Sequence, residues 1–313
     1  MIGAANQPAM NDAQYRLLCD LVRKHYGLHF SEDTRFLVEK RVARRLDQLG
    51  TTSVSSYLYE LRRAGPGSDE MSALVDELTT NETYFFRELS QLRALIEEIV
   101  PERRLGRPDA RSDQPVHIWS AGCSSGEEPY TIVMMALEAG LVPGRDLRIY
   151  ASDVAPSVLT KARRGVYRPA SFRETPDVLR DKYFVEKDGQ YRIHDEVKNC
   201  VDFIHLNLMD PAKIALLGRM DVILCRNVII YFDHDTKKQV IDTFYDRMRP
   251  GGYLLLGHSE SLITLSRSFE LCHLRNDLVY RRPVPGEEKT DPWHRLAEQA
   301  VADSDGPARG GRS

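Results

Sequence analysis

Apolar residues in the first third of the chain recur at intervals of three and four. Between residues 15 and 26 they form one face of a predicted helix, with Asn11 or Asp12 as its cap and Gly27 after its end. The same spacing predicts further helices at about residues 36–49, 55–63, 69–78 and 89–100. We expect a helical N-terminal domain over residues 1–88 and a connecting helix and linker over 89–115, with the helix ending ahead of Pro101.

A different pattern begins at residue 116, where short apolar runs alternate with helical stretches. The predicted strands are 116–120, 147–152, 201–207, 221–225, 252–257 and 279–280. The predicted helices between them are 129–139, 156–164 and 236–248. This alternation is typical of an α/β domain built on a doubly wound, Rossmann-like parallel sheet, which we place at residues 116–282.

Two segments depart from this alternation. Residues 184–186 and 191–194 flank Asp188-Gly189 and predict a hairpin, within a small antiparallel β-subdomain inserted at about 167–200. Residues 283–313 are rich in Pro, Gly and charge, and we expect a disordered tail in which 293–302 can form a transient helix.

Composition narrows the class of protein. The 313 residues are 42% hydrophobic and 28% charged with a formal net charge of −3, so a globally basic nucleic-acid-binding chain is disfavoured. The five cysteines form no Cys-x-x-Cys pair and the nine histidines no metal-binding spacing, so no metal is expected. Neither a secretory signal nor an apolar run long enough to span a bilayer is visible, which favours the cytoplasm.

The turn after the first predicted strand is the most informative segment. The strand at 116–120 runs into Gly122-Cys-Ser-Ser-Gly126, and a helix is predicted from Pro129. Small residues let a ligand approach the backbone, and a helix N-terminus offers free amide donors. A tight strand-to-helix turn without any ligand explains this segment equally well.

Polar residues follow the later strands as well. Asp153 ends the second strand, where an acid can accept hydrogen bonds from ribose hydroxyls or can instead cap the helix at Pro156. The third strand ends at Asn207, and the fourth ends at Arg226-Asn227. These ends meet at the carboxyl edge of a parallel sheet, where such sheets bind their ligands.

Two nucleoside cofactors compete for this edge. The turn lacks the Gly-x-Gly-x-x-Gly pattern that cradles a pyrophosphate, which disfavours NAD. S-adenosylmethionine has no phosphate but needs an anion for its amino group and a cation for its carboxylate. Glu127 and Arg87 are candidates for these two roles.

Six stretches, in order, resemble the CheR family of chemotaxis-receptor glutamate O-methyltransferases. They are Asn81-Glu-Thr-Tyr-Phe-Phe-Arg-Glu88, Trp119-Ser-Ala-Gly-Cys-Ser-Ser-Gly-Glu-Glu-Pro-Tyr130, Ala151-Ser-Asp153, Asn207-Leu208, Cys225-Arg-Asn-Val-Ile-Ile-Tyr-Phe232 and Gly257-His-Ser-Glu260. The resemblance covers nearly everything from about residue 14 to residue 280. It implies a helical domain joined to an S-adenosylmethionine-binding domain with a small β-subdomain, and S-adenosylhomocysteine as the product.

The resemblance also assigns residues. Family cofactor contacts fall on Asn81, Thr83, Arg87, Glu127, Asp153, Asn207, Leu208, Arg226 and Asn227. Tyr231 matches a tyrosine beside the methyl-transfer site, and we predict that it orients the acceptor carboxylate; a partly buried tyrosine that closes the strand is the alternative. A glutamate acceptor has a pKa of about 4.3 and is already ionised at neutral pH, so no general base is required.

Cations on the second predicted helix are the candidates for receptor contact. They are Arg35, Lys40, Arg41, Arg44 and Arg45. A solvated helix face is the plain interpretation, whereas the resemblance favours a patch that steers an acidic helical domain of a receptor. Many family members also dock on a pentapeptide at the receptor's C-terminus, but the loop at 186–190 is short, so we do not expect tethering here.

Two other functions stay open. An RNA methyltransferase predicts a basic face over both domains. The single basic helix and the net negative charge of the chain argue against this function. A non-catalytic sensor of S-adenosylmethionine predicts damage between Arg226 and Tyr231, and none is visible. We expect a monomer that binds receptors and no nucleic acid.

Overall fold

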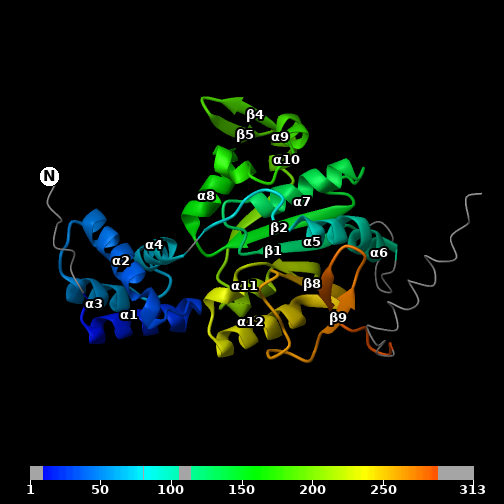
Figure 1. The fold of residues 1–313 in the computed structure, drawn as a ribbon. Helices are drawn as coiled ribbons and strands as arrows, with labels where there is room; N and C mark the ends of the chain where they lie inside the picture. Colours follow the sequence, from blue (N-terminus) through cyan, green and yellow to red (C-terminus); the bar gives the residue numbers. More distant parts are fainter. Residues whose placement is uncertain (1–9, 80, 106–113, 288–313) are drawn as a thin grey trace, which may run out of the picture.

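The helical part of the molecule lies at one end of the fold (Figure 1). The computed structural model describes residues 10–79, 81–105 and 114–287. The helices of this part are α1 (Asp12–Tyr26), α2 (Arg35–Leu49), α3 (Val54–Ala64) and α4 (Asp69–Leu78). A capping box between Asn11 and Gln14 begins α1, and Gly27, with a φ of 74°, ends it. All four predicted helices of this region are therefore confirmed.

The connecting helix departs from its prediction. It consists of α5 (Leu89–Ala94), a π-turn η2 (Leu95–Ile99) and α6 (Val100–Leu105), so Pro101 does not end it. The π-turn shifts the hydrogen-bond register, with Val100 N–H donating to the Leu95 carbonyl. Pro101 then occupies the second position of α6, where a missing N–H is tolerated.

Seven strands of the described residues form one sheet in the order β6-β2-β1-β7-β8-β10-β9. They are β1 (Val116–Ala121), β2 (Leu147–Asp153), β6 (Val201–His205), β7 (Met220–Cys225), β8 (Met248–Leu256), β9 (Glu270–His273) and β10 (Leu278–Arg281). The first five in spatial order are parallel, whereas β10 runs antiparallel to β8 and β9 antiparallel to β10. The doubly wound sheet is confirmed, and β9 is an addition that the sequence did not predict.

Helices cover both faces of this sheet (Figure 1). They include α7 (Glu127–Glu138), α8 (Pro156–Arg164), α11 (Pro211–Ala215) and α12 (His234–Arg247). Alternate side chains of β1 enter two different cores. Ile118 packs in the core that includes α5–α7, and Trp119 packs in the core shared with α12 and the N-terminal bundle. The apolar core on one face of the sheet is therefore continuous with the core of the bundle.

The insertion between β2 and β6 is a second, three-stranded antiparallel sheet with the order β3-β5-β4. Its strands are β3 (Val166–Tyr167), β4 (Phe184–Lys187) and β5 (Gln190–Ile193), accompanied by η3 (Pro169–Phe172), α9 (Asp177–Tyr183) and α10 (Asp195–Lys198). Asp188 and Gly189 both have positive φ, 54° and 70°, as a two-residue hairpin turn of type I′ requires. The predicted hairpin is confirmed.

Candidate functional site

A cavity of about 320 Å³ lies at the carboxyl edge of the main sheet. Its volume falls in the range of small-molecule sites. Predicted site residues in its wall are Asn81, Thr83, Arg87, Asp153, Asn207, Leu208, Arg226, Asn227 and Tyr231. They come from the segment before α5, from the end of β2 and from the loops after β6 and β7, so folding gathers residues that are 150 positions apart (81 to 231) in one wall.

The glycine-containing turn forms one side of this cavity. Gly122 and Cys123 donate their backbone N–H groups to the Ser152 carbonyl, at 2.8 and 2.9 Å. Gly122 has a φ of 82°, and a Cβ there would lie 2.4 Å from a methyl carbon of Val228. Only glycine fits this position, because the turn after β1 is packed directly against the loop after β7.

Asp153 is buried at the end of β2. Its Oδ2 accepts a hydrogen bond from Ser124 N–H at 2.8 Å, and its Oδ1 accepts one from Ala155 N–H at 2.9 Å. Helix α8 has no side-chain cap, so the capping interpretation of Asp153 is not supported. Burial raises the pKa of this carboxyl, and the backbone donors oppose the rise. Two carboxylate oxygens in the cavity wall can accept hydrogen bonds from ligand hydroxyls.

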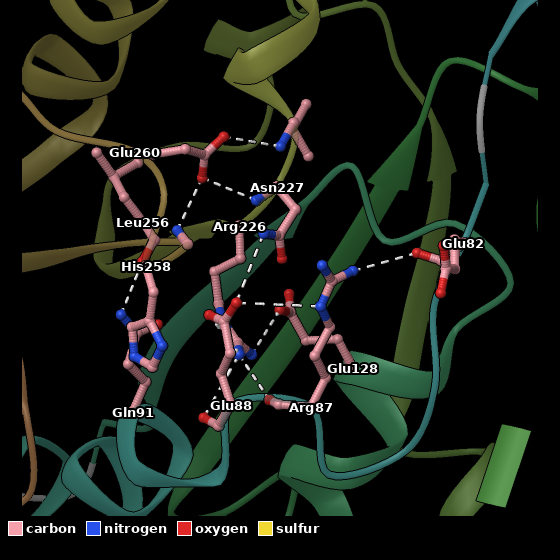
Figure 2. A network of polar contacts seen from close by, with 12 residues as sticks. Glu82, Arg87, Glu88, Gln91, Glu128, Arg226, Asn227, Leu256, His258 and Glu260 are labelled. Carbon is pink, nitrogen blue, oxygen red and sulfur yellow. Dashed lines mark hydrogen bonds and ion pairs between the residues drawn. The ribbon is translucent and has the colours of Figure 1, made fainter. Parts of the chain in front are cut away.

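Arg226 lies at the centre of a buried polar network (Figure 2). Its Nη1 is 3.1 Å from a Glu128 carboxylate oxygen, and its Nη2 is 3.1 Å from a Glu88 carboxylate oxygen and 2.6 Å from the Arg87 carbonyl. Its Nε has no partner among the described residues. Of the two carboxylates around this guanidinium, Glu128 lines the cavity and suits a ligand ammonium group, while the guanidinium of Arg87, also in the wall, suits a ligand carboxylate.

Glu127 does not lie in the cavity wall, contrary to its predicted role. It is 2% exposed, and its carboxylate accepts hydrogen bonds from the hydroxyls of Ser125 (2.8 Å) and Ser171 (3.1 Å). Burial raises its pKa. Glu128 lines the cavity instead. Successive helix residues point about 100° apart, so the sequence alone could not decide between these two neighbours at the start of α7.

Tyr231 lies where the N-terminal bundle meets the sheet. It belongs to the short turn η4 (Ile229–Tyr231), and its carbonyl accepts a hydrogen bond from His29 N–H at 2.8 Å. Burial raises the pKa of its phenol, and the nearby guanidiniums of Arg87 and Arg41 oppose the rise. Tyr231 is therefore protonated at neutral pH and can donate a hydrogen bond, with Arg87, Arg41 and the carboxylate of Glu82 as charged neighbours.

The predicted cationic patch on α2 is largely paired within the bundle. The ion pairs are Arg35 with Asp12 and Glu39, Arg44 with Glu77, and Arg45 with Glu70. Arg41 donates a hydrogen bond to the Leu78 carbonyl and lies near Tyr231. Lys40 is exposed and forms no ion pair with any described residue. The patch is thus weaker than five free cations.

Three acidic residues of the site had no predicted role. Glu88 and Glu128 contact Arg226, and Glu260 binds the loop after β7. All three lie within the stretches that resemble the CheR family, so that resemblance was the signal that could have identified them.

Across the described chain, no group of three or more His, Cys, Asp or Glu residues could hold a metal ion. None of the described helices combines the length and apolar character needed to cross a membrane.

The sheet has the strand order given above, and β10 runs antiparallel to both of its neighbours. Together with the cavity at the carboxyl edge, this topology defines a Rossmann-like methyltransferase. The family model "CheR methyltransferase, SAM binding domain" matches residues 81–278, and "CheR methyltransferase, all-alpha domain" matches residues 13–79. This chain belongs to the CheR methyltransferase family.

Curated relatives agree with this assignment. Chemotaxis protein methyltransferase 2 of Vibrio cholerae serotype O1 is 37% identical over 284 residues, which cover 90% of this chain and 97% of the relative. The chemotaxis protein methyltransferase of Escherichia coli strain K12 is 37% identical over 278 residues, covering 87% of this chain and 91% of the relative.

Proposed function

We propose that this protein transfers the methyl group of S-adenosylmethionine to glutamate side chains of chemotaxis receptors. The products are glutamate methyl esters and S-adenosylhomocysteine. The observation that carries the proposal is the single cavity that unites Asp153, the Arg226 network and Tyr231 in a CheR-family chain. Relatives of similar length are named chemotaxis protein methyltransferases, which supports a receptor as the acceptor.

The cavity wall fits the parts of this cofactor. Asp153 would accept hydrogen bonds from the ribose hydroxyls, and Asn207 and Leu208 would hold the base. Glu128 would balance the ammonium group, and the guanidinium of Arg87 would pair with the cofactor carboxylate. The other predicted wall residues, which complete the enclosure, are Asn81, Thr83, Arg226 and Asn227.

The chemistry is a displacement that requires no proton transfer before attack. Bound S-adenosylmethionine supplies an electrophilic methyl group. The acceptor carboxylate, with a reference pKa of about 4.3, is ionised at neutral pH. Tyr231 donates a hydrogen bond to one acceptor oxygen and leaves the other to attack, while Arg41 and Arg87 attract the acceptor. Positioning of the acceptor against the cofactor then lowers the barrier.

The acceptor is the helical cytoplasmic domain of a receptor, and we propose that a cytoplasmic monomer engages it without pentapeptide tethering. The hairpin that would present the docking surface has only Asp188 and Gly189 between β4 and β5. The functional division is a helical domain at 1–88, a connector at 89–115 and a methyltransferase domain at 116–282 with its insertion at 167–200. The predicted tail at 283–313 lies mostly outside the described residues.

A methylation assay tests the proposal. The purified chain is incubated with S-adenosylmethionine labelled in its methyl group and with cytoplasmic receptor fragments, each with and without its last five residues. We expect protein-bound label that mild base releases as methanol, at a KM that the truncation does not change. Fragments with alanine at the labelled glutamates are the matched control and should take up no label.

The same assay separates the alternative functions. Total RNA is offered in parallel, and label on nucleotides rather than on receptor would identify an RNA methyltransferase. Binding of S-adenosylhomocysteine without transfer to any acceptor would indicate a sensor. The net charge of −3 and the paired cations on α2 make the RNA outcome the less expected one.

A further inference from the structure

Glu260, in the turn after β8, binds the backbone of a different loop (Figure 2). Its Oε2 accepts hydrogen bonds from the N–H groups of Asn227 and Gly257, both at 2.7 Å. Its Oε1 accepts hydrogen bonds from the N–H groups of Val228 (3.0 Å) and Ile230 (3.2 Å). One carboxylate therefore satisfies four backbone donors, three of which lie in the loop after β7.

That loop carries much of the chemistry assigned to the cavity. Between β7 and η4 it supplies Arg226 and Asn227 to the wall, and Tyr231 follows at its end. Asn227 has a φ of 59°, in the left-handed region that costs a residue other than glycine about 1 kcal/mol. The loop therefore needs an external partner to keep this conformation.

The surroundings of Glu260 are built around this contact. A Cβ on Gly257 would lie 2.7 Å from Asn227 Nδ2 and 2.9 Å from Asn227 N, so glycine is what allows the two loops to approach. No lysine or arginine of the described chain pairs with Glu260. Its partners are backbone amides, which form a nest for an anion. A carboxylate suits this nest better than a neutral amide, since each oxygen can accept two hydrogen bonds.

We propose that Glu260 is a positioning residue for methyl transfer. Its carboxylate fixes residues 227–230 so that Asn227 and Tyr231 keep their places in the cavity wall, although Glu260 itself does not line that cavity. This role rests on the proposed function, because its consequence is the rate of transfer to the acceptor.

The variant Glu260→Gln tests this role. Glutamine keeps the size of the side chain but turns an NH₂ group toward two of the four backbone donors, whichever way the amide faces. We expect kcat to fall about 30-fold, equivalent to about 2 kcal/mol, with the receptor KM and the stoichiometry of S-adenosylhomocysteine binding unchanged. Amide hydrogen exchange at residues 227–230 should become faster. Glu260→Asp, which keeps the charge, should retain an intermediate kcat.

Glu98→Gln is the matched control. The Glu98 carboxylate also accepts backbone hydrogen bonds, from Arg275 N (2.9 Å) and Asn276 N (3.1 Å), but these residues do not line the cavity. This variant should lose thermal stability without losing kcat per binding-competent molecule. A general effect of removing a backbone-binding glutamate would appear in both variants, whereas a positioning effect appears only at Glu260.

Two results would overturn the inference. One is a kcat of Glu260→Gln within threefold of wild type. The other is a loss of rate that only follows a loss of binding-competent protein, with hydrogen exchange at 227–230 unchanged. If the wild-type chain itself methylates no receptor, the proposed function fails, but the exchange and binding measurements still decide whether Glu260 holds the loop.

Discussion

Strand β2 is preceded by one buried aspartate and ends in another, and their environments are opposite. Asp146, at the amino edge of the sheet, accepts hydrogen bonds from the guanidiniums of Arg104 and Arg145 and from the N–H of Val142. These partners lower its pKa to about 2. Asp153, at the carboxyl edge, has backbone donors and no ion pair within the described chain, and burial raises its pKa.

This contrast separates a structural charge from a functional one. At the amino edge, the carboxylate of Asp146 is neutralised by arginines of the same chain. Asp221, at the start of β7, is neutralised in the same way by Arg103. At the carboxyl edge the carboxylate is desolvated without a cation, so its unfavourable burial is relieved when a ligand donates hydrogen bonds to it. Burial alone therefore does not mark a site, whereas burial of a carboxylate beside a cavity without a neutralising cation does.

The largest effect should follow from Asp153→Asn. The substitution removes the charge that receives the cofactor's ribose hydroxyls, and we expect the Kd for S-adenosylhomocysteine to rise about 50-fold, or about 2.3 kcal/mol. The free energy of unfolding at pH 7 should fall by no more than about 1 kcal/mol, because the amide NH₂ faces one of the two backbone donors while the cost of burying a charge without a cation is removed. Calorimetric titration and urea unfolding measure the two quantities. A Kd within threefold of wild type would break the comparison.

Asp146→Asn should give the reverse result. The free energy of unfolding at pH 7 should fall by about 1–3 kcal/mol, the range for hydrogen bonds to a charged group, and the Kd should stay within twofold of wild type. The folded pKa of Asp146 is about 2, below its ordinary value of 3.8, so the unfolded state binds more protons between these values. The stability advantage of wild type is therefore present above pH 3.8 and lost as the pH falls through about 2. A pH-independent difference would contradict this account.

Tyr231→Phe tests a second residue at the carboxyl edge, one that is assigned to the acceptor rather than to the cofactor. Phenylalanine keeps the ring but removes the hydroxyl that orients the acceptor, so kcat should fall about tenfold, or about 1.4 kcal/mol. The Kd for S-adenosylhomocysteine should not change, since the hydroxyl is assigned to the acceptor rather than to the cofactor. Steady-state rates with a receptor fragment and titration of the same preparation test both statements. Equal rates for the two proteins would leave Tyr231 as a packing residue that closes the strand.

The sequence predicted the residues at the carboxyl edge of the sheet better than those at its amino edge. Periodicity located β2 and its helices, and the polar residue at the end of each parallel strand indicated the ligand edge, which is why Asp153 was identified. Asp146 was not, because its neutralisation depends on Arg104, a residue of the connecting helix that only folding brings near. The choice between Glu127 and Glu128 required the rotational phase of α7, and the role of Glu260 required contacts between two loops. Local patterns reveal elements and strand ends, whereas pairing between distant charges is a tertiary property.

The smallest effect should come from the exposed charges of α2, which extend the comparison to solvent. Lys40 and Arg44 are exposed, and reversing both to glutamate should slow receptor methylation about fourfold at low salt and less than twofold near 0.5 M salt, where screening is strong. Arg41 is left unchanged because it donates to the Leu78 carbonyl.

The matched control for this charge reversal lies on α3. Arg62 and Arg63 are exposed and away from the cavity, and reversing both changes the net charge by the same amount. The α3 variant should methylate receptor fragments at nearly the wild-type rate at every salt concentration. An equal loss in both variants would point to net charge alone, and a loss at α2 that salt does not change would exclude steering. A loss at α2 that disappears with salt would instead show that its solvated cations act over a distance, unlike the buried carboxylate of Asp153, which acts by contact.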